Sequence, residues 1–100
     1  MYYFYVLISK LDSSYYYGST INLRRRYQEH AGGKVNSTKN RLPLELIYYE
    51  AYNLQELARS REQQVKRSGS VRAALHKRIT RTEKGHARPP KGSRAISSAG

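Results

Sequence analysis

An arginine and a histidine occupy the apolar face of a short helix that the sequence predicts near its N-terminus. Leu23, Arg26, Tyr27 and His30 are spaced i, i+3, i+4, i+7, so they share one face of a helix. A core-facing stripe normally consists of apolar residues, because charged side chains are rarely buried without a partner. Packing alone therefore does not explain Arg26 and His30, and their position indicates a functional site.

Tyrosines precede this helix in two segments that must lie side by side. Residues 2–9 form a continuous β-rich run around Tyr5, and Tyr15-Tyr16-Tyr17 resumes strand character after a short polar connection. Strands joined by so short a loop form an antiparallel hairpin. The apolar first run predicts a strand covered on both faces, and we expect at most one or two of the ten tyrosines to take part in chemistry. Gly18 is expected to end the second strand, because the backbone turns sharply there or another group approaches closely.

The segment after this hairpin reads as a helix, a polar loop and a third strand. We expect one of Ser19, Thr20 and Asn22 to cap the helix, and Gly32-Gly33 to end it in a left-handed conformation. A polar loop over residues 34–41 leads to a strand over residues 44–50, in which Glu45 faces solvent. Five cations in these segments and the next helix are predicted to contact phosphate: Arg25, Lys34, Lys39, Arg41 and Lys66. An ordinary solvated surface is the competing interpretation for Arg25 and for the loop.

A second helix, expected over residues 54–67, carries one carboxylate at the edge of its apolar face. Asn53 and Glu56 have the spacing of a capping box, and the predicted core-facing row consists of Leu54, Leu57, Ala58, Arg61 and Val65. Glu62 lies at the edge of that row, in a run with four basic residues. Charge alone favours an ion pair with Arg59 or Lys66. The alternative is that Glu62 holds a divalent cation.

The last part of the chain divides into a short helix and a basic tail. Residues 71–79 are expected to be helical, with Val71, Ala74, Leu75 and Arg78 in one phase. From Thr80 onward the sequence is basic, contains Pro and Gly, and almost lacks large apolar residues, which favours disorder. We therefore predict one domain over residues 1–79 and a disordered tail over residues 80–100 with loose affinity for polyanions.

The net charge of +12 and a pI near 10.2 indicate a polyanionic partner, because clustered Lys and Arg release counterions from phosphate backbones. An anionic membrane is the competing partner, but no expected helix pairs a broad apolar face with a basic one. A merely soluble basic protein is the third possibility. The chain has no cysteine, no long apolar run and no recognisable signal peptide, so we expect a cytoplasmic protein.

Four segments carry a joint resemblance to a known family: Tyr3-Phe4-Tyr5, Tyr16-Tyr17-Gly18, residues 23–30 and residues 61–66. In this order and spacing they resemble the GIY-YIG nuclease family. The first two segments stand where the family has Gly-Ile-Tyr and Tyr-Ile-Gly. The third matches the helix with the family's arginine, here Arg26, and its Tyr/His position, here His30. The fourth matches the helix with the metal-binding glutamate, here Glu62.

The similarity covers about residues 2–80 and is greatest to small stand-alone members of the family. The resemblance implies an α/β fold with a three-stranded antiparallel sheet flanked by helices. It implies a DNA endonuclease with one Mg²⁺ or Mn²⁺ on Glu62, acting on branched or single-stranded DNA and serving DNA repair or recombination. Arg26 would clamp the scissile phosphate. Tyr5 or Tyr16 would position or deprotonate the attacking water, with His30 as an assisting base.

Two other functions are compatible with the same sequence. A non-catalytic nucleic-acid-binding module would keep the basic surface of the fold, although it would have no reason to keep Glu62 at a core edge. An RNA-associated accessory protein is favoured only by the basic tail. The combination of Tyr5, Tyr16, Arg26, His30 and Glu62 favours the enzyme.

Overall fold

The computed structural model describes residues 1–85 of the chain, with side chains described for residues 1–80. Its elements follow the order of strand, strand, helix, strand, helix, helix. They are β1 (Tyr2–Ser9), β2 (Tyr15–Thr20), α1 (Leu23–Ala31), a 3-10 helix η1 (Lys39–Arg41), β3 (Leu44–Tyr52), α2 (Gln55–Arg67) and α3 (Gly69–Gly85). No helix in the described part is long and apolar enough to cross a membrane.

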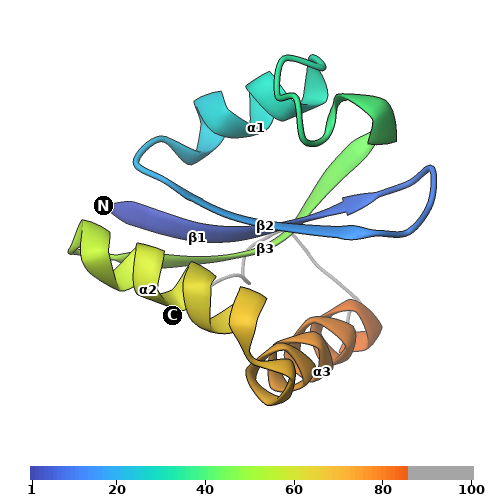
Figure 1. The fold of residues 1–100 in the computed structure, drawn as a ribbon. Helices are drawn as coiled ribbons and strands as arrows, with labels where there is room; N and C mark the ends of the chain where they lie inside the picture. The colour runs from blue at the N-terminus through green and yellow to red at the C-terminus, as the bar shows by residue number, and fades with distance from the viewer. Residues whose placement is uncertain (86–100) are drawn as a thin grey trace.

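The three strands form one antiparallel sheet in the order β2-β1-β3, with β1 in the centre. The hairpin places Tyr5 opposite Gly18 on one side, and the pairing with β3 places it opposite Tyr49 on the other. Helix α1 lies over one face of the sheet, whereas α2 and α3 lie over the other (Figure 1). The expected α/β architecture, a three-stranded antiparallel sheet flanked by helices, is confirmed.

Alternation along β1 supplies two separate cores, one on each face of the sheet. Phe4 and Val6 are fully buried and pack with Val65 of α2 and with Leu75 and Ile79 of α3. Tyr5 and Leu7 point to the opposite face, which α1 covers, and pack with Leu44. Because successive side chains of a strand point to opposite faces, a strand covered on both sides must be apolar throughout. The expectation for residues 2–9 is confirmed.

The second strand does not end at Gly18, as the sequence predicted, but continues to Thr20. The turn follows it, and Asn22 caps α1 by accepting a hydrogen bond from the Arg25 backbone N–H at 3.0 Å. The other end of α1 is as expected, since Gly33 has φ of 76°. Gly18 is therefore needed because the Tyr5 side chain approaches its backbone closely, and not because the chain turns there.

The beginning of α2 differs from the prediction in its cap and in its exposed leucines. Asn53 does not cap the helix; Leu54 takes the cap position in extended conformation, without a side-chain hydrogen bond. Leu54 and Leu57 are 49% and 44% exposed, while Ala58 and Val65 are buried. The reason is geometric, because only the row through Ala58 and Val65 meets the sheet, and the first turn of α2 projects beyond it (Figure 1).

Helix α3 is longer than predicted and uses a different row for packing. Leu75 and Ile79 are buried, whereas Ala74 and Arg78 are exposed. The helix continues to Gly85, so the expected boundary at Thr80 falls inside it, and the buried Ile79 ties that part of the helix to the core. Residues 86–100 of the predicted tail lie outside the described residues.

Candidate active site

Tyr5 is the centre of the half of the site that faces α1. Its side chain is 2% exposed, and its hydroxyl oxygen lies 3.0 Å from Nε2 of His30. A Cβ atom built on Gly18, its cross-strand partner, would lie only 2.5 Å from Oη of Tyr5. Only glycine leaves room for that hydroxyl group at the sheet edge, which explains the family-like Tyr-x-Gly pattern physically.

His30 links this tyrosine to the loop that follows α1. It is completely buried, and its Nδ1 lies 2.8 Å from Oγ1 of Thr38. Burial, together with a smaller effect of the positive charge of Arg26, lowers the pKa of His30 to about 4. His30 is therefore neutral at physiological pH. The ring of Tyr16 packs against it with 4.9 Å between ring centroids.

Arg26 brings a positive charge to the same group. Its guanidinium donates to Oε1 of Glu29 at 3.0 Å, on a partly exposed part of α1. Burial raises the pKa of Tyr5 to about 12, although a hydrogen bond with Arg26 and the arginine's charge oppose that rise. The structure thus brings together the predicted Tyr5, Tyr16, Arg26 and His30, and the free protein holds Tyr5 as a neutral phenol.

Glu62 approaches the sheet from the opposite face, on α2. Its Oε1 accepts a hydrogen bond from Oγ of Ser19 at 2.7 Å, and its Oε2 lies 2.6 Å from Nζ of Lys66. The predicted ion pair with Lys66 is therefore present. A pocket of about 430 Å³ opens beside this carboxylate, lined by Ser19, Glu62 and neighbouring residues of β2 and α2. Tyr5 and Arg26 do not line the pocket, because they lie across the sheet.

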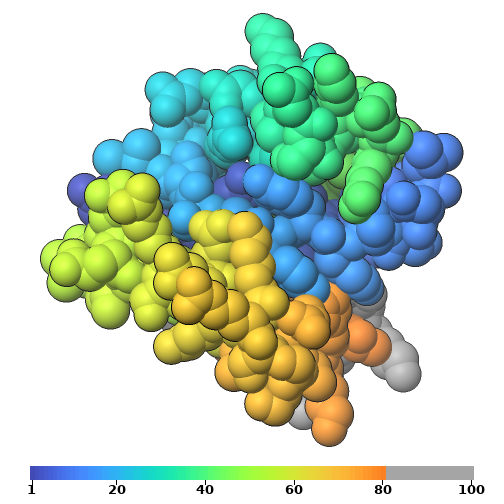
Figure 2. Space-filling view, in the orientation of Figure 1, coloured from blue at the N-terminus to red at the C-terminus, as the bar shows by residue number. Residues whose placement is uncertain are grey.

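The two halves of the site meet at the edge strand β2. On one face of the sheet the Tyr5 hydroxyl lies against Gly18. On the other face, the hydroxyl of the next residue, Ser19, donates a hydrogen bond to Glu62. The negative charge of Glu62 also reaches Tyr5, since it contributes to raising the tyrosine's pKa. Figure 2 shows this edge of the molecule, with β2 exposed between α1 above it and α2 below.

Helix α2 is anchored so that Glu62 is held toward β2. The preceding residue, Arg61, donates to both carboxylate oxygens of Glu50 on β3, at 3.0 and 3.2 Å. Tyr48 and Tyr52 donate to the same carboxylate at 2.7 and 2.6 Å. Because consecutive helical residues point in directions about 100° apart, clamping Arg61 to β3 turns Glu62 toward the other edge of the sheet.

The donor set at Glu62 suits Mg²⁺ or Mn²⁺. Among the described residues no group of three or more His, Asp and Glu side chains lies together, so Glu62 would be the protein's carboxylate ligand. Magnesium keeps several waters and is commonly bound by one or two carboxylates plus substrate phosphates. Glu62 already attracts one cation, the ammonium of Lys66, and this exposed side chain would have to move away.

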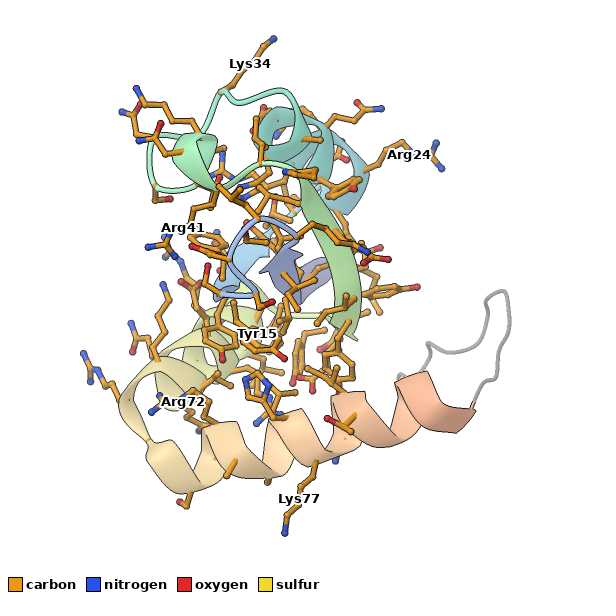
Figure 3. The ribbon with its side chains drawn as sticks, turned by 90° about the vertical axis from the view of Figure 1, so that its right-hand side faces the viewer. Tyr15, Arg24, Lys34, Arg41, Arg72 and Lys77 are labelled. Atoms are coloured by element: carbon orange, nitrogen blue, oxygen red, sulfur yellow. The ribbon has the colours of Figure 1, made fainter. Side chains whose placement is uncertain are left out.

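The cations predicted to contact nucleic acid do not form one cluster. Lys66 lies at Glu62, and Arg41 donates to Oγ of Ser14 at the end of the hairpin. Figure 3 shows Lys34 at the far end of the molecule from Lys77, away from α2 and α3. Arg25 is a partner of Glu29 on the surface of α1, at 3.9 Å. Lys39, in η1, is exposed, and the role of all five stays a prediction.

Sequence reasoning missed two polar residues of the site, Ser19 and Thr38. Ser19 supports Glu62, although the sequence suggested it only as a candidate cap for the first helix. Thr38 was assigned to a polar surface loop, yet it is 1% exposed and hydrogen-bonded to His30.

Comparison with known proteins identifies the family of the chain. The model of the GIY-YIG catalytic domain matches residues 1–71. The chain belongs to the GIY-YIG family. The match extends from β1 through α2 and so includes every element of the candidate site. GIY-YIG proteins are a nuclease family that acts on DNA and generally depends on divalent metal ions.

Several curated GIY-YIG relatives carry the name UPF0213 protein. The one from Streptococcus pyogenes serotype M3 is 37% identical over 83 residues, which cover 82% of this chain and 78% of the relative. The one from Streptococcus pneumoniae is 44% identical over 66 residues, covering 65% and 66%. The solution structure of a Bacillus halodurans UPF0213 protein covers 82% of this chain and 86% of its own, with 32% identity and a TM-score of 0.50.

Proposed function

We propose that this chain is a metal-dependent DNA endonuclease that hydrolyses a phosphodiester bond at the edge of β2. One observation carries the proposal: Tyr5 and Glu62, from opposite faces of the sheet, approach β2 at the neighbouring residues Gly18 and Ser19. Structural packing does not require a neutral tyrosine–histidine pair and a carboxylate to converge on one exposed edge. Phosphodiester hydrolysis does, because it needs an activated water and compensation of developing negative charge.

Arg26 is the group that would bind the scissile phosphate. Its planar guanidinium can donate to two phosphate oxygens at once. In the free protein one of its donors is occupied by Glu29, an ion pair in which both side chains are more than a third exposed. Exposed pairs of this kind contribute little free energy, so a phosphate can replace Glu29 at low cost.

Tyr5, rather than Tyr16, is the tyrosine that would handle the proton of the attacking water. The Tyr5 hydroxyl has both His30 and Arg26 as partners, whereas Tyr16 contributes ring packing to Tyr5 and His30. Tyr5 is a poor base in the free protein, because burial outweighs the opposing effect of Arg26 and raises the pKa of Tyr5 to about 12. Hydrogen-bond donors stabilise the deprotonated form, and His30 and Arg26 are placed to provide them.

Glu62 would hold the divalent cation, with Ser19 keeping its carboxylate in place. A cation there would supply positive charge that stabilises the leaving oxygen of the phosphodiester. Lys66, which leaves Glu62 when a cation binds, would then be free to contact the DNA backbone as a point charge.

A cleavage panel tests the proposal. Purified protein is incubated with plasmid, single-stranded and branched DNA in Mg²⁺, Mn²⁺ or EDTA, beside Glu62→Ala. Wild type should nick or cut at least one DNA form with either metal and none in EDTA. Glu62→Ala should bind DNA with similar affinity and lose cleavage by about a hundredfold or more. If wild type binds every DNA form and leaves all of them intact with both metals, the chain is a non-catalytic binding module instead. A role in DNA repair or recombination stays a prediction.

A further inference from the structure

The hydroxyl of Thr38 is buried against Nδ1 of His30, the ring nitrogen that does not contact Tyr5. Thr38 is 1% exposed, and its Oγ1 lies 2.8 Å from Nδ1 of His30. Its backbone is fixed independently, since its N–H donates to Val35 O and its carbonyl accepts from Arg41. Although Thr38 stands at the N-cap position of η1, its side chain makes no capping hydrogen bond. Within the part of the chain that the structure describes, the Thr38 hydroxyl therefore forms a hydrogen bond only with His30.

The number of hydrogens in this chain of contacts is limited. His30 is neutral, and a neutral imidazole has one N–H donor and one acceptor nitrogen. If Nδ1 carries the hydrogen, it donates to Thr38, and Nε2 accepts from the Tyr5 hydroxyl. If Nε2 carries it, Nε2 donates to Oη of Tyr5, and Nδ1 accepts from the Thr38 hydroxyl. The heavy-atom distances of 2.8 and 3.0 Å suit both arrangements.

Satisfaction of buried donors distinguishes the two arrangements. In the first, the hydrogen of Thr38 points into the interior, where the described residues offer it no acceptor other than His30. In the second, Thr38 uses that hydrogen on Nδ1, and the Tyr5 hydrogen is the one left over. Tyr5 is 2% exposed, but its Oη lies beside Arg26, whose side chain is 36% exposed, and a water molecule next to the guanidinium can accept this hydrogen. Buried polar hydrogens are rarely left without a partner, so the second arrangement is favoured.

We infer that Thr38 is a positioning residue whose hydroxyl donates to Nδ1 of His30, so that Nε2 carries the hydrogen and donates to Oη of Tyr5. Together with Arg26, this places two donors on the Tyr5 oxygen, which favours its deprotonated form as a base for water. The effect on cleavage rests on the proposed function, whereas the tautomer is a property of the free protein.

The tautomer can be measured without any activity. Two-bond proton–nitrogen NMR correlations on the ¹⁵N-labelled full chain at neutral pH distinguish the protonated from the unprotonated ring nitrogen. The ring signals that disappear in His30→Gln are those of His30. His76, whose Nε2 is hydrogen-bonded to the Tyr17 hydroxyl, provides an internal reference for these signals. We expect hydrogen on Nε2 of His30 and an unprotonated, hydrogen-bonded Nδ1. Hydrogen on Nδ1 would overturn the inference.

Two variants test the consequence for the site. In Thr38→Val the hydrogen-bond shift of Nδ1 should disappear, and single-turnover cleavage should fall about five- to tenfold, as expected for loss of one buried hydrogen bond. Thr38→Ser keeps the hydroxyl and should restore both signals. A folded Thr38→Val that cuts DNA at the wild-type rate would refute the positioning role. If Thr38→Val does not fold, the wild-type and Thr38→Ser spectra still decide the tautomer. If wild type cuts no DNA, the proposed function fails, and the tautomer is decided separately.

Discussion

The hydroxyl oxygen of Tyr5 lies where a side chain on Gly18 would begin, because a Cβ atom at Gly18 would be 2.5 Å from it. The tyrosine ring is buried and cannot move aside freely. We predict that Gly18→Ala displaces the hydroxyl from His30. Overpacking should lower the free energy of unfolding by about 2 kcal/mol, and cleavage should fall more than stability explains. Urea unfolding and single-turnover cleavage at saturating protein measure the two effects.

Gly69→Ala is the matched control for this change. Its Cβ would meet only the end of the Arg72 side chain, at 3.8 Å, which is ordinary van der Waals contact, and alanine is favoured in a helix. Stability and cleavage should both stay near the wild-type values. Equal effects of the two substitutions would show that Gly18 has no special relationship with Tyr5.

Ser19 supports Glu62, so its hydroxyl should matter for metal binding. Removing an outer partner of a metal ligand typically weakens metal affinity or activity about 10- to 100-fold. We predict that Ser19→Ala raises the Mn²⁺ concentration needed for half-maximal cleavage about tenfold. It should weaken stabilisation of the fold by Mn²⁺ to a similar degree, as measured by thermal unfolding. Ser70→Ala, which removes an exposed hydroxyl that pairs with the side chain of Ser68, should change neither. An unchanged Mn²⁺ response of Ser19→Ala would contradict the account.

His30 should make folding stability depend on pH between about 4 and 6.5. Its folded pKa is about 4, below the ordinary value of 6.5, so the unfolded chain binds more protons in this range. The contribution is present above pH 6.5 and is lost as the pH falls toward 4. Between pH 7 and pH 4.5 wild type should lose about 2 kcal/mol more stability than His30→Gln. Urea unfolding at both values measures this difference, and equal losses would mean that His30 is not buried as a neutral ring.

Arg41 is expected to contact a DNA phosphate beside the hairpin. Each neutralised phosphate contributes about one unit to the slope of log affinity against log salt concentration. Arg41→Ala should therefore flatten that slope by about one unit. Lys77, which points away from the sheet in Figure 3, provides the control, since Lys77→Ala should leave the slope unchanged. Binding titrations at several salt concentrations decide between Arg41 as a contact and Arg41 as a solvated surface group.

Local periodicity accounts for most of what the sequence predicted correctly. Arg26 and His30 were recognisable because a polar residue in an apolar helical phase is conspicuous, and the phase depends only on local spacing. The first two strands and the hairpin were predictable from other local properties, the β-rich composition of the strands and the short connection between them. Glu62 was correctly placed at the edge of a helical face, with the ion pair to Lys66 as one of its two interpretations.

The errors concern properties that depend on elements distant in sequence. Leu54 and Leu57 fit an apolar helical row, but spacing cannot show that the sheet ends before it reaches them. Thr38 is buried only because the loop folds back over His30, and no local pattern distinguishes it from a surface threonine. Gly18 carried two interpretations, a turn or a close approach, and choosing between them required the position of Tyr5 on the neighbouring strand.

Single-turnover cleavage by wild type, Tyr5→Phe and Glu62→Gln, with DNA binding measured on the same preparations, tests the central claim most directly. Each variant alters one of the two halves of the site that meet at β2. The account predicts that wild type cuts DNA with Mg²⁺ or Mn²⁺, and that both variants bind DNA normally while cleavage falls by about a hundredfold or more. It is contradicted if wild type leaves DNA intact, or if either variant cuts as fast as wild type.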